Sequence, residues 1–390
     1  MDNTLNKHCI FHVPLQLRSD IKSASNIRPI KMIEAFRSIG YNVDVVMGDS
    51  GTRRKQITAI KHNIKRGMQY DFVYAESSTM PNALTDQDHV PRAPFLDCQF
   101  FKYCKNKGIP VGLFYRDVYW MYEAYLPNDP IKATLARFFY KVDIRAYRKC
   151  LSALFLPDAP SFFKNASVTV LPMAKPYIEV LKSIPFFSLP PGCEKDLCNY
   201  GGQFSEDTTV GPSRPLKIFY VGGIGGHYDL HPLLEATKLF RNCMLTLCVR
   251  EKDWIQVIDE YAPFLNERTK VVHAAGADLG DYYRQADICS LVVGRNDYWA
   301  MAVPYKLYEY ATYGIPIVAT NLGIAADIIE HNRIGWIVEP TVESICELLA
   351  FLTSNPSAIN EKKIQIMHFA QENTWECRAQ NVAKILRVSE

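Results

Sequence analysis

The residues best suited to chemistry lie on a predicted helix, Tyr305–Tyr313. Pro304 suits the start of a helix, and Gly314 suits the left-handed residue that ends one. Lys306 and Glu309 are three residues apart and therefore share a face. A cation near a helix N-terminus favours phosphate, and a carboxylate one turn later can accept hydrogen bonds from sugar hydroxyls. The alternative is a solvated Lys306–Glu309 pair on a helix that only packs.

A second candidate follows the strand predicted at Lys217–Val221. Its loop contains Gly223, Gly225 and Gly226 and precedes a predicted helix. Glycines let backbone N–H groups approach a phosphate closely. The dinucleotide pattern GxGxxG is not met, because its sixth position is Tyr228. A tight turn without a ligand is the alternative.

Two cations follow the next predicted strand, Met244–Val249. Arg250 and Lys252 stand at its carboxyl end, the edge of an open α/β sheet where ligands bind. They could neutralise the charge of an anionic ligand there. The alternative is that both are ordinary surface charges.

The first half of the chain offers a polar pair among aromatic residues. Arg116 and Asp117 follow the strand predicted at Val111–Tyr115 and precede Tyr119 and Trp120. Such a pair is costly to bury without partners, so we expect it to line a cleft. A structural Arg–Asp pair beside an aromatic cluster is the alternative.

These residues must be positioned by alternating strands and helices. Apolar strands separated by helices indicate parallel sheets covered on both faces. The predicted strands are Cys9–Val13, Val43–Met47, Phe72–Ala75, Val111–Tyr115, Ala153–Leu156, Val168–Leu171, Lys217–Val221, Met244–Val249, Lys270–His273, Ile288–Val293 and Ile315–Ala319. We predict an α/β fold of two successive doubly wound, Rossmann-like domains.

Domain boundaries follow from a break in this pattern. The stretch 183–215 is rich in Pro and Gly and has no sustained period, which is typical of a loop or linker. We predict an N-terminal domain over 1–190, a linker over 191–215 and a C-terminal domain over 216–370. A C-terminal helix over 371–390 could cross back to the N-terminal domain.

Composition excludes several classes. The 390 residues are 48% hydrophobic, and their 11 Cys lack the spacing of a zinc site. No HExxH, GxxxxGK[ST] or GxSxG motif occurs, the N-terminus is polar, and no apolar run approaches the ~18–20 residues of a membrane span. We expect a cytoplasmic protein without a metal.

Charge divides unevenly between the two halves. Residues 1–190 carry 26 Lys and Arg against 16 Asp and Glu, whereas residues 191–390 carry 18 against 25. The first half should therefore meet something anionic. Its predicted basic helix, Arg53–Met68, could lie on anionic lipid or could be a solvated face over a core. Nucleic acid is not predicted, because the basic residues are not interleaved with an aromatic stacking platform.

The segment from Pro304 to Val338 resembles the donor-binding half of GT-B glycosyltransferases, most closely the retaining family four. The motifs that carry the resemblance are Lys306, Glu309-Tyr-Ala, Gly314-Ile-Pro-Ile-Val-Ala-Thr, Gly323, Asp327-Ile-Ile and Gly335-Trp-Ile-Val, with upstream matches at Tyr220-Val-Gly-Gly-Ile and Tyr283-Arg-Gln-Ala-Asp-Ile-Cys-Ser-Leu. It covers about residues 216–340 well. It implies the GT-B fold, in which two doubly wound, Rossmann-like domains face a cleft.

The resemblance also implies roles for residues in the second half. The carboxylate at the place of Glu309 holds the nucleotide ribose, and the glycine loop approaches the diphosphate. The implied donor-binding residues are Gly223, Gly225, Gly226, Arg250, Lys252, Asp297, Lys306, Glu309 and Gly323. The family usually has a second Glu that contacts the donor sugar, and Met301 stands in its place. Asp297 or Asn296 could substitute for it.

In the first half, Arg116-Asp117 looks like the His-Asp dipeptide of these transferases, with Arg in place of His. Asp117 could bind a sugar hydroxyl and Arg116 a phosphate. The expected catalytic residues are Arg116, Asp117, Arg250 and Lys306, and the expected acceptor-binding residues are Asn26, Arg28, Tyr119 and Trp120. Asn26 and Arg28 enter because the loop after the first strand faces the cleft in these enzymes.

The expected activity is transfer of a sugar, in the manner of a hexosyltransferase, from a nucleotide-diphosphate donor to a hydroxyl of a glycan or lipid-linked acceptor. The acceptor would bind the N-terminal domain and the donor the C-terminal domain. The resemblance favours retention, no cofactor, and a setting in bacterial cell-surface polysaccharide or glycolipid synthesis, with peripheral contact at the inner face of the cell membrane. The alternatives are a nucleotide-sugar epimerase of the same architecture and a degenerate transferase that serves as a scaffold.

Overall fold

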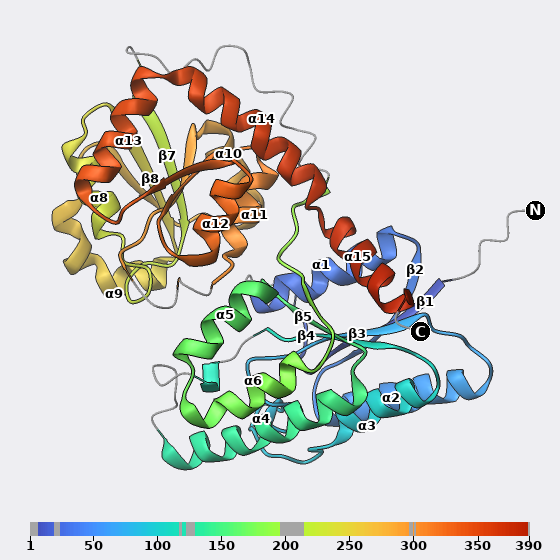
Figure 1. Ribbon diagram of the computed structural model, residues 1–390. Coiled ribbons are helices and arrows are strands. Elements are labelled where there is room, and N and C mark those ends of the chain that lie inside the picture. The colour runs from blue at the N-terminus through green and yellow to red at the C-terminus, as the bar shows by residue number, and fades with distance from the viewer. Residues whose placement is uncertain are drawn as a thin grey trace, which may run out of the picture. The chain divides into compact units, whose positions relative to one another are not determined.

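The chain divides into two units, each built on a parallel six-stranded sheet (Figure 1). The computed structural model describes residues 7–18, 24–116, 119–121, 129–195, 214–295, 299 and 302–388, without the side chains of residues 24, 25, 119, 165–169 and 277. The first unit joins the chain up to Pro191 with the segment from Trp375 onward. The second unit spans Gly192–Thr374.

The sheet of the first unit has the strand order β2-β1-β3-β4-β5-β6. Its strands are β1 (Lys7–Val13), β2 (Tyr41–Met47), β3 (Phe72–Glu76), β4 (Val111–Phe114), β5 (Ala153–Leu156) and β6 (Phe186–Ser188). The chain leaves β1 toward one edge and returns on its other side, so β1 and β3 flank the topological switch point. In open α/β sheets, ligands bind at the carboxyl ends of the strands at such a point.

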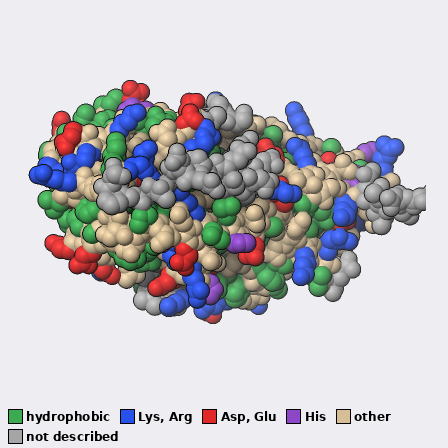
Figure 2. All heavy atoms as spheres, turned by 90° about the horizontal axis from the view of Figure 1, so that it is seen from above, with side chains coloured by type: hydrophobic (Ala, Val, Ile, Leu, Met, Phe, Trp, Pro, Cys, Tyr) green, Lys and Arg blue, Asp and Glu red, His purple; other side chains and the backbone are tan. Residues whose placement is uncertain are grey.

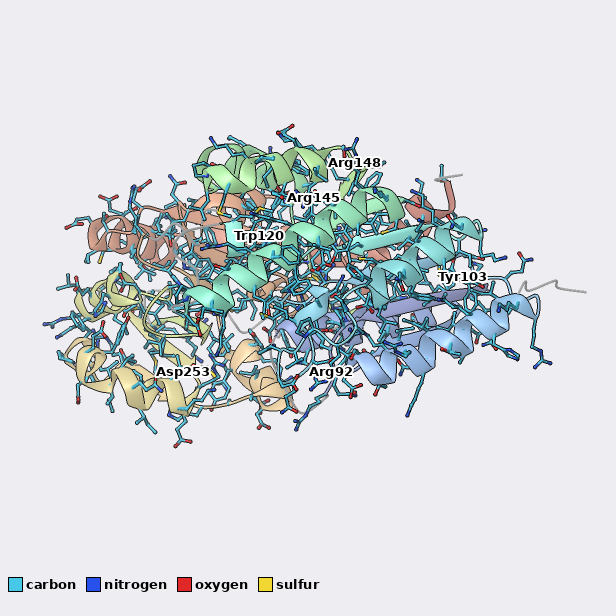
Figure 3. The ribbon with its side chains drawn as sticks, turned by 90° about the horizontal axis from the view of Figure 1, so that it is seen from below. Arg92, Tyr103, Trp120, Arg145, Arg148 and Asp253 are labelled. Carbon is cyan, nitrogen blue, oxygen red and sulfur yellow. The ribbon has the colours of Figure 1, made fainter. Side chains whose placement is uncertain are left out.

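Two layers of helices cover this sheet. They are α1 (Ala24–Ser38), α2 (Ser50–Lys65), α3 (Leu96–Asn106), α4 (Pro130–Cys150), α5 (Ala159–Thr169), α6 (Lys175–Lys182) and α15 (Trp375–Val388). Helices α1 and α15 lie together on one face, and α2, α3, α4 and α6 lie side by side on the other (Figures 1 and 3). Phe36 of α1 packs against Phe11, Phe72 and Tyr74 of the sheet, so these strands are buried on both faces as their apolar sequences require.

The sheet of the second unit has the strand order β12-β11-β10-β7-β8-β9. Its strands are β7 (Leu216–Gly222), β8 (Cys243–Val249), β9 (Thr269–Val272), β10 (Ile288–Leu291), β11 (Ile317–Thr320) and β12 (Gly335–Val338). Here the switch point lies between β7 and β10. The loops after these two strands therefore meet at the edge where a ligand is expected.

Helices also cover both faces of this second sheet. They are α8 (His231–Leu239), α9 (Glu251–Tyr261), α10 (Leu279–Gln285), α11 (Tyr305–Thr312), α12 (Gly323–His331), α13 (Val342–Ser354) and α14 (Pro356–Glu372). Ile218 and Tyr220 of β7 pack with α8 and α13, whereas Phe219 between them packs with α10, α11 and α14. This alternation follows from the two-residue period of a strand. The predicted fold class, two doubly wound Rossmann-like domains, is confirmed for each unit.

Some predicted elements are wrong. The strand expected at Val168–Leu171 is the end of helix α5, which begins after Asp158, whose side chain accepts a hydrogen bond from the Ser161 N–H at 2.9 Å. That cap and Pro160 in the first turn start a helix whose last residues are β-branched and look like a strand in isolation. The stretch expected to be a loop contains β6, which pairs with β5.

Helix α2 does not present the lipid-facing surface considered for Arg53–Met68. Its apolar residues Ile57 and Ile60 are buried in the core. Arg53 is also buried, and its guanidinium binds the Asp97 carboxylate through Nε at 3.0 Å and Nη2 at 3.1 Å. The helix therefore exposes only its polar face, and the alternative of a solvated face over a core is the correct one. No helix of the described residues is long and apolar enough to cross a membrane.

Candidate functional site

The two loops that meet at the switch point of the second unit hold the strongest cluster of functional groups. One is the glycine-rich loop after β7, and the other leads from β10 into α11. Helix α11 begins directly after Pro304, and Gly314, with φ +67°, follows its end as predicted. A helix N-terminus with a lysine in its first turn thus stands beside a glycine loop, which suits an anion.

The ammonium of Lys306 is enclosed by aromatic rings. Its Nζ lies 4.7 Å from the ring centre of Tyr220 and 4.8 Å from that of Tyr228. It also donates to the Tyr220 hydroxyl at 3.4 Å. Gly222 makes this position possible, because a Cβ atom there would lie 1.5 Å from the Lys306 Nζ. The lysine is held over the backbone at the end of β7 and is not a solvated surface charge.

Enclosure changes the acid strength of this lysine. Burial lowers the pKa of Lys306 to about 7, and the positive charge of Arg250 lowers it further, while Glu309 acts in the opposite direction. A bound diphosphate would supply the missing counter-charge. The protein groups around Lys306 therefore do not fully balance its positive charge, as expected for an anion-binding site.

Glu309 lies one turn beyond Lys306 and is half-buried. Burial raises the pKa of its carboxyl group, and Glu194 raises it further, whereas the Tyr283 hydroxyl and Lys306 lower it. No direct ion pair joins Glu309 to Lys306 in this structure, so the predicted alternative of a solvated pair does not apply. A carboxylate in this setting can accept hydrogen bonds from a ligand's hydroxyls.

The glycine loop closes on itself. The N–H groups of Gly225 and Tyr228 each donate to the other residue's carbonyl oxygen at 3.0 Å. Gly225 and Gly226 have positive φ angles of +79° and +57°. The Gly225 N–H is used within the turn, so a phosphate would have to be met by other N–H groups of the loop. Gly223 is needed for a different reason, because a Cβ there would lie 2.6 Å from the Tyr228 ring.

The loop after β10 packs against the glycine loop and stabilises it. The Trp299 indole N–H donates to the His227 carbonyl oxygen at 2.6 Å, and its ring meets the Tyr228 ring edge-on with centres 5.3 Å apart. The Gly294 N–H donates to the Asp229 carbonyl oxygen at 2.8 Å. These contacts fix Tyr228, which in turn forms one wall around Lys306.

The other predicted donor-binding residues differ in where they lie. Arg250 directly precedes α9, pairs with Asp253 at 2.6 Å, and is close enough to influence the pKa values of Lys306 and Tyr228. Lys252 is exposed on α9 and has no carboxylate partner among the described residues. Gly323 begins α12 with φ +59°, and no side chain caps that helix. Asn296, Asp297 and Met301 lie outside the described residues.

The first unit has a buried charge cluster at the carboxyl edge of its sheet. Glu76 ends β3 with 0% exposure and lies 2.8 Å from Nη2 of Arg116 and 3.4 Å from Nε of Arg28. The Tyr74 hydroxyl also donates to it at 3.1 Å. Two guanidinium groups share one carboxylate, so the cluster carries a net positive charge.

Two of the four predicted acceptor-binding residues, Arg28 and Trp120, are buried inside the first unit. Arg28 is 5% exposed, stacks 3.6 Å from the Phe114 ring centre and donates to the Leu189 carbonyl oxygen at 3.1 Å. Trp120 is buried and stacks on Tyr140, with ring centres 5.4 Å apart. Direct contact of either with an acceptor is therefore not supported. For Trp120 the predicted alternative, an aromatic cluster, describes the structure.

The remaining predictions in the first unit are placed only in part. The Asn26 side chain accepts a hydrogen bond from the Arg18 N–H at 3.1 Å, which ties the loop after β1 to α1. Asp117 lies outside the described residues, as does the side chain of Tyr119. Arg116 is held by its own N–H, which donates to the Ser77 hydroxyl at 3.0 Å.

A cavity of about 200 Å³ lies beside Arg116. Leu15, Ser78, Thr79 and His89 contribute to its walls, and these residues follow β1 and β3 at the switch point of the first sheet. Hydroxyl groups, an imidazole and a guanidinium around a small cavity suit a polar ligand. Sequence reasoning missed this cavity, because its walls come from separate loops.

Sequence reasoning also assigned no role to Tyr220 and Tyr228. Both rings face Lys306 across gaps of 86 and 78 positions in the sequence. Tyr220 stands in a buried strand, where an aromatic residue is unremarkable. The only local signal was its place two residues before Gly222.

This chain is similar to one known protein family and to several solved structures. Residues 205–367 match the family described as glycosyl transferases group 1. No curated protein sequence gives a significant match. Among solved structures, HepE of Anabaena in complex with UDP is similar over 97% of this chain and 98% of its own, with 11% identity and a TM-score of 0.62.

Two further structures show the same architecture. Sucrose-phosphate synthase from Thermosynechococcus elongatus is similar over 98% of this chain and 99% of its own, with 12% identity and a TM-score of 0.64. WaaG, a glycosyltransferase involved in lipopolysaccharide biosynthesis, is similar over 97% and 99%, with 13% identity and a TM-score of 0.54. At such identities these likenesses establish the fold.

Two Rossmann-like domains with parallel six-stranded sheets define the GT-B class. The match over residues 205–367 then identifies a glycosyl transferases group 1 region, which lies in the second unit. The family resemblance in the sequence is confirmed.

Proposed function

We propose that this glycosyltransferase moves a sugar from a nucleotide-diphosphate donor, bound by the second unit, to a hydroxyl acceptor, bound by the first. The observation that carries the proposal is the Lys306 ammonium, held over Gly222 between two tyrosine rings with Glu309 one turn away. A diphosphate would meet Lys306 and Arg250. The nucleotide ribose hydroxyls would donate to Glu309.

The reaction breaks the bond between the anomeric carbon and the diphosphate oxygen and forms a bond to the acceptor oxygen. Negative charge grows on the leaving diphosphate, so fixed cations lower the barrier. We propose the retaining outcome, in which the leaving phosphate takes the proton of the acceptor hydroxyl. The products are the glycosylated acceptor and a nucleoside diphosphate, and the chemistry needs no metal or cofactor.

The acceptor is proposed to bind beside Arg116, where the 200 Å³ cavity opens among loops at the carboxyl edge of the first sheet. The net positive charge of Arg28, Arg116 and Glu76 favours an acceptor that carries a phosphate or carboxylate close to its reacting hydroxyl. Such acceptors occur in the assembly of lipid-linked glycans. We therefore place the reaction in bacterial cell-surface polysaccharide or glycolipid synthesis, at the inner face of the cell membrane.

Thermal unfolding with nucleoside diphosphates and their sugars tests the donor assignment. A ligand at one hundred times its Kd should raise Tm by roughly 5–10 °C, because it binds only the native state. The shift should vanish in Glu309→Ala and persist in Glu330→Ala, which removes an exposed carboxylate from α12. Equal shifts in both variants would contradict the ribose assignment. Turnover of the donor sugar without any acceptor would instead indicate an epimerase.

A further inference from the structure

Helix α4 carries apolar side chains on its solvent side. Ile131, Leu135 and Phe138 are 79%, 41% and 58% exposed, and Ile131 is the most exposed large apolar side chain among the described residues. Their spacing of four and three residues places them in one stripe along the helix. The stripe is a surface feature, because the helix has a separate buried face.

That buried face prevents the helix from rolling the stripe inward. Phe139, Tyr140, Ile144 and Tyr147 are buried, and α4 packs between α3 and α6. Tyr140 is further held by the stacked ring of Trp120. The orientation of α4 is thus set by the core, and no described residue of the chain covers its apolar stripe.

Cations surround and extend the stripe. Helix α4 carries six of them, Lys132, Arg137, Lys141, Arg145, Arg148 and Lys149. Arg145 and Lys149 continue the stripe by helical spacing toward the C-terminus, and Figure 3 shows Arg145 and Arg148 along this helix. The one acidic residue of the helix, Asp143, is buried on the opposite face.

The few nearby carboxylates leave this charge largely uncompensated. Asp129 caps the start of α4 and approaches only Lys132, at 4.0 Å, and Glu179 of α6 pairs with Lys182 at 3.0 Å. Within the described residues, no carboxylate pairs with Arg145, Arg148 or Lys149. On the face shown in Figure 2, by contrast, acidic and basic side chains are interspersed.

We propose that α4 is the surface by which the first unit binds an anionic lipid bilayer. Ile131, Leu135 and Phe138 enter between the headgroups, while the cations of the second half of the helix meet lipid phosphates. The inference deepens the proposed function, on which its biological purpose rests, because a lipid-linked acceptor is reached at a membrane surface. Binding to vesicles itself requires no catalytic activity.

The size and chemistry of the stripe favour a bilayer over a second copy of the chain. Its apolar part spans two turns, about 10 Å, whereas a stable protein interface buries about 800 Å² on each partner. A bilayer needs only shallow insertion of apolar side chains together with attraction of cations to anionic headgroups. Neither three apolar side chains nor a few cations would bind a bilayer strongly alone, and α4 carries both.

Flotation with lipid vesicles tests the proposal. The full-length protein should bind vesicles of phosphatidylcholine mixed with phosphatidylglycerol and not vesicles of phosphatidylcholine alone. Phe138→Ser should weaken binding about tenfold through lost apolar contact. Arg148→Gln with Lys149→Gln should weaken it about 25-fold, because each cation near an anionic surface contributes about fivefold. All three changed side chains are exposed, so folding should be preserved.

Matched controls come from the same chain. Arg37→Gln with Lys384→Gln removes the same charge from the exposed sides of α1 and α15, which cover the opposite face of the sheet, and Leu239→Ser removes an exposed apolar side chain at the end of α8. Both should retain binding within about twofold, because charges far from the bilayer are screened. Glu309→Ala should bind vesicles as the parent does, which separates this proposal from the donor assignment.

Three results would overturn the proposal. The parent protein could fail to bind anionic vesicles. The Arg37 and Lys384 pair could weaken binding as much as the α4 pair, which would show attraction by net charge without a defined surface. Light scattering could show a dimer that Phe138→Ser dissociates, which would make a second copy the occupant of α4.

Discussion

The acid strength of Lys306 leads to a measurable pH dependence of donor binding. In the empty site the pKa of Lys306 is about 7, chiefly because the side chain is buried, so near neutral pH about half of the molecules lack this charge. A bound diphosphate should restore an ordinary lysine pKa of ~10 by pairing with the ammonium. Donor binding should therefore take up a proton.

The magnitude follows from these two pKa values. Affinity is full below pH 7, where Lys306 is already charged, and falls as the pH rises through 7, because the proton must first be bound. For a free-site pKa of about 7, the apparent Kd at pH 8 should be about ten times that at pH 6. At pH 8 binding should take up nearly one proton, and at pH 7 about half of one.

Isothermal titration with a nucleotide sugar in buffers of different ionisation enthalpy measures both quantities. A nucleotide-diphosphate sugar is preferable to a nucleoside diphosphate, because each of its phosphates carries one ester and one anhydride bond and keeps a single, strongly acidic group that stays ionised across this range. Lys306→Arg, which remains charged at every pH used, should lose the pH dependence. An apparent Kd that stays constant from pH 6 to 8 in the parent, without proton uptake, would refute the reasoning.

Three further changes have defined outcomes. Gly222→Ala should weaken donor binding at least tenfold, since the new Cβ displaces the Lys306 ammonium from its proposed charge-assisted hydrogen bond to the donor's diphosphate. Gly280→Ala on α10 should bind the donor as the parent does, because the nearest atom to its new Cβ lies 3.4 Å away. Arg28→Met should lower the free energy of unfolding in urea by about 3 kcal/mol, because it removes one partner of a buried carboxylate; a loss below about 1 kcal/mol would show that Arg116 alone suffices for Glu76. Transfer activity should survive excess EDTA, and its loss with recovery on adding Mg²⁺ would contradict the metal-independent mechanism.

The fold could be predicted largely from periodicity. Apolar strands that alternate with helices predict two parallel sheets, and ten of the 12 strands in the described residues coincide with predicted runs, whereas β6 and β12 were not predicted. Val168–Leu171 looks like a strand by composition, yet the Asp158 cap makes it the end of a helix. Cap chemistry decided between two conformations that the apolar pattern alone leaves open.

The site could be predicted only where its residues share one element. Lys306 and Glu309 are a turn apart on α11, so their common face follows from helical geometry. Arg28 and Trp120, by contrast, were expected near a ligand and are internal, because burial depends on what other segments place around a side chain. A polar or aromatic residue after a strand does not by itself reveal which way it faces.

Three features follow from residues that are close together in the chain. They are the α/β class, the helix between Pro304 and Gly314, and the cation and carboxylate that share a face of that helix. Three others follow from packing between distant segments: Tyr220 and Tyr228 enclose Lys306, α2 buries its isoleucines, and α4 leaves Ile131 and Phe138 in solvent. These outcomes depend on contacts between segments that are far apart in the chain, and such contacts form only when the whole domain packs.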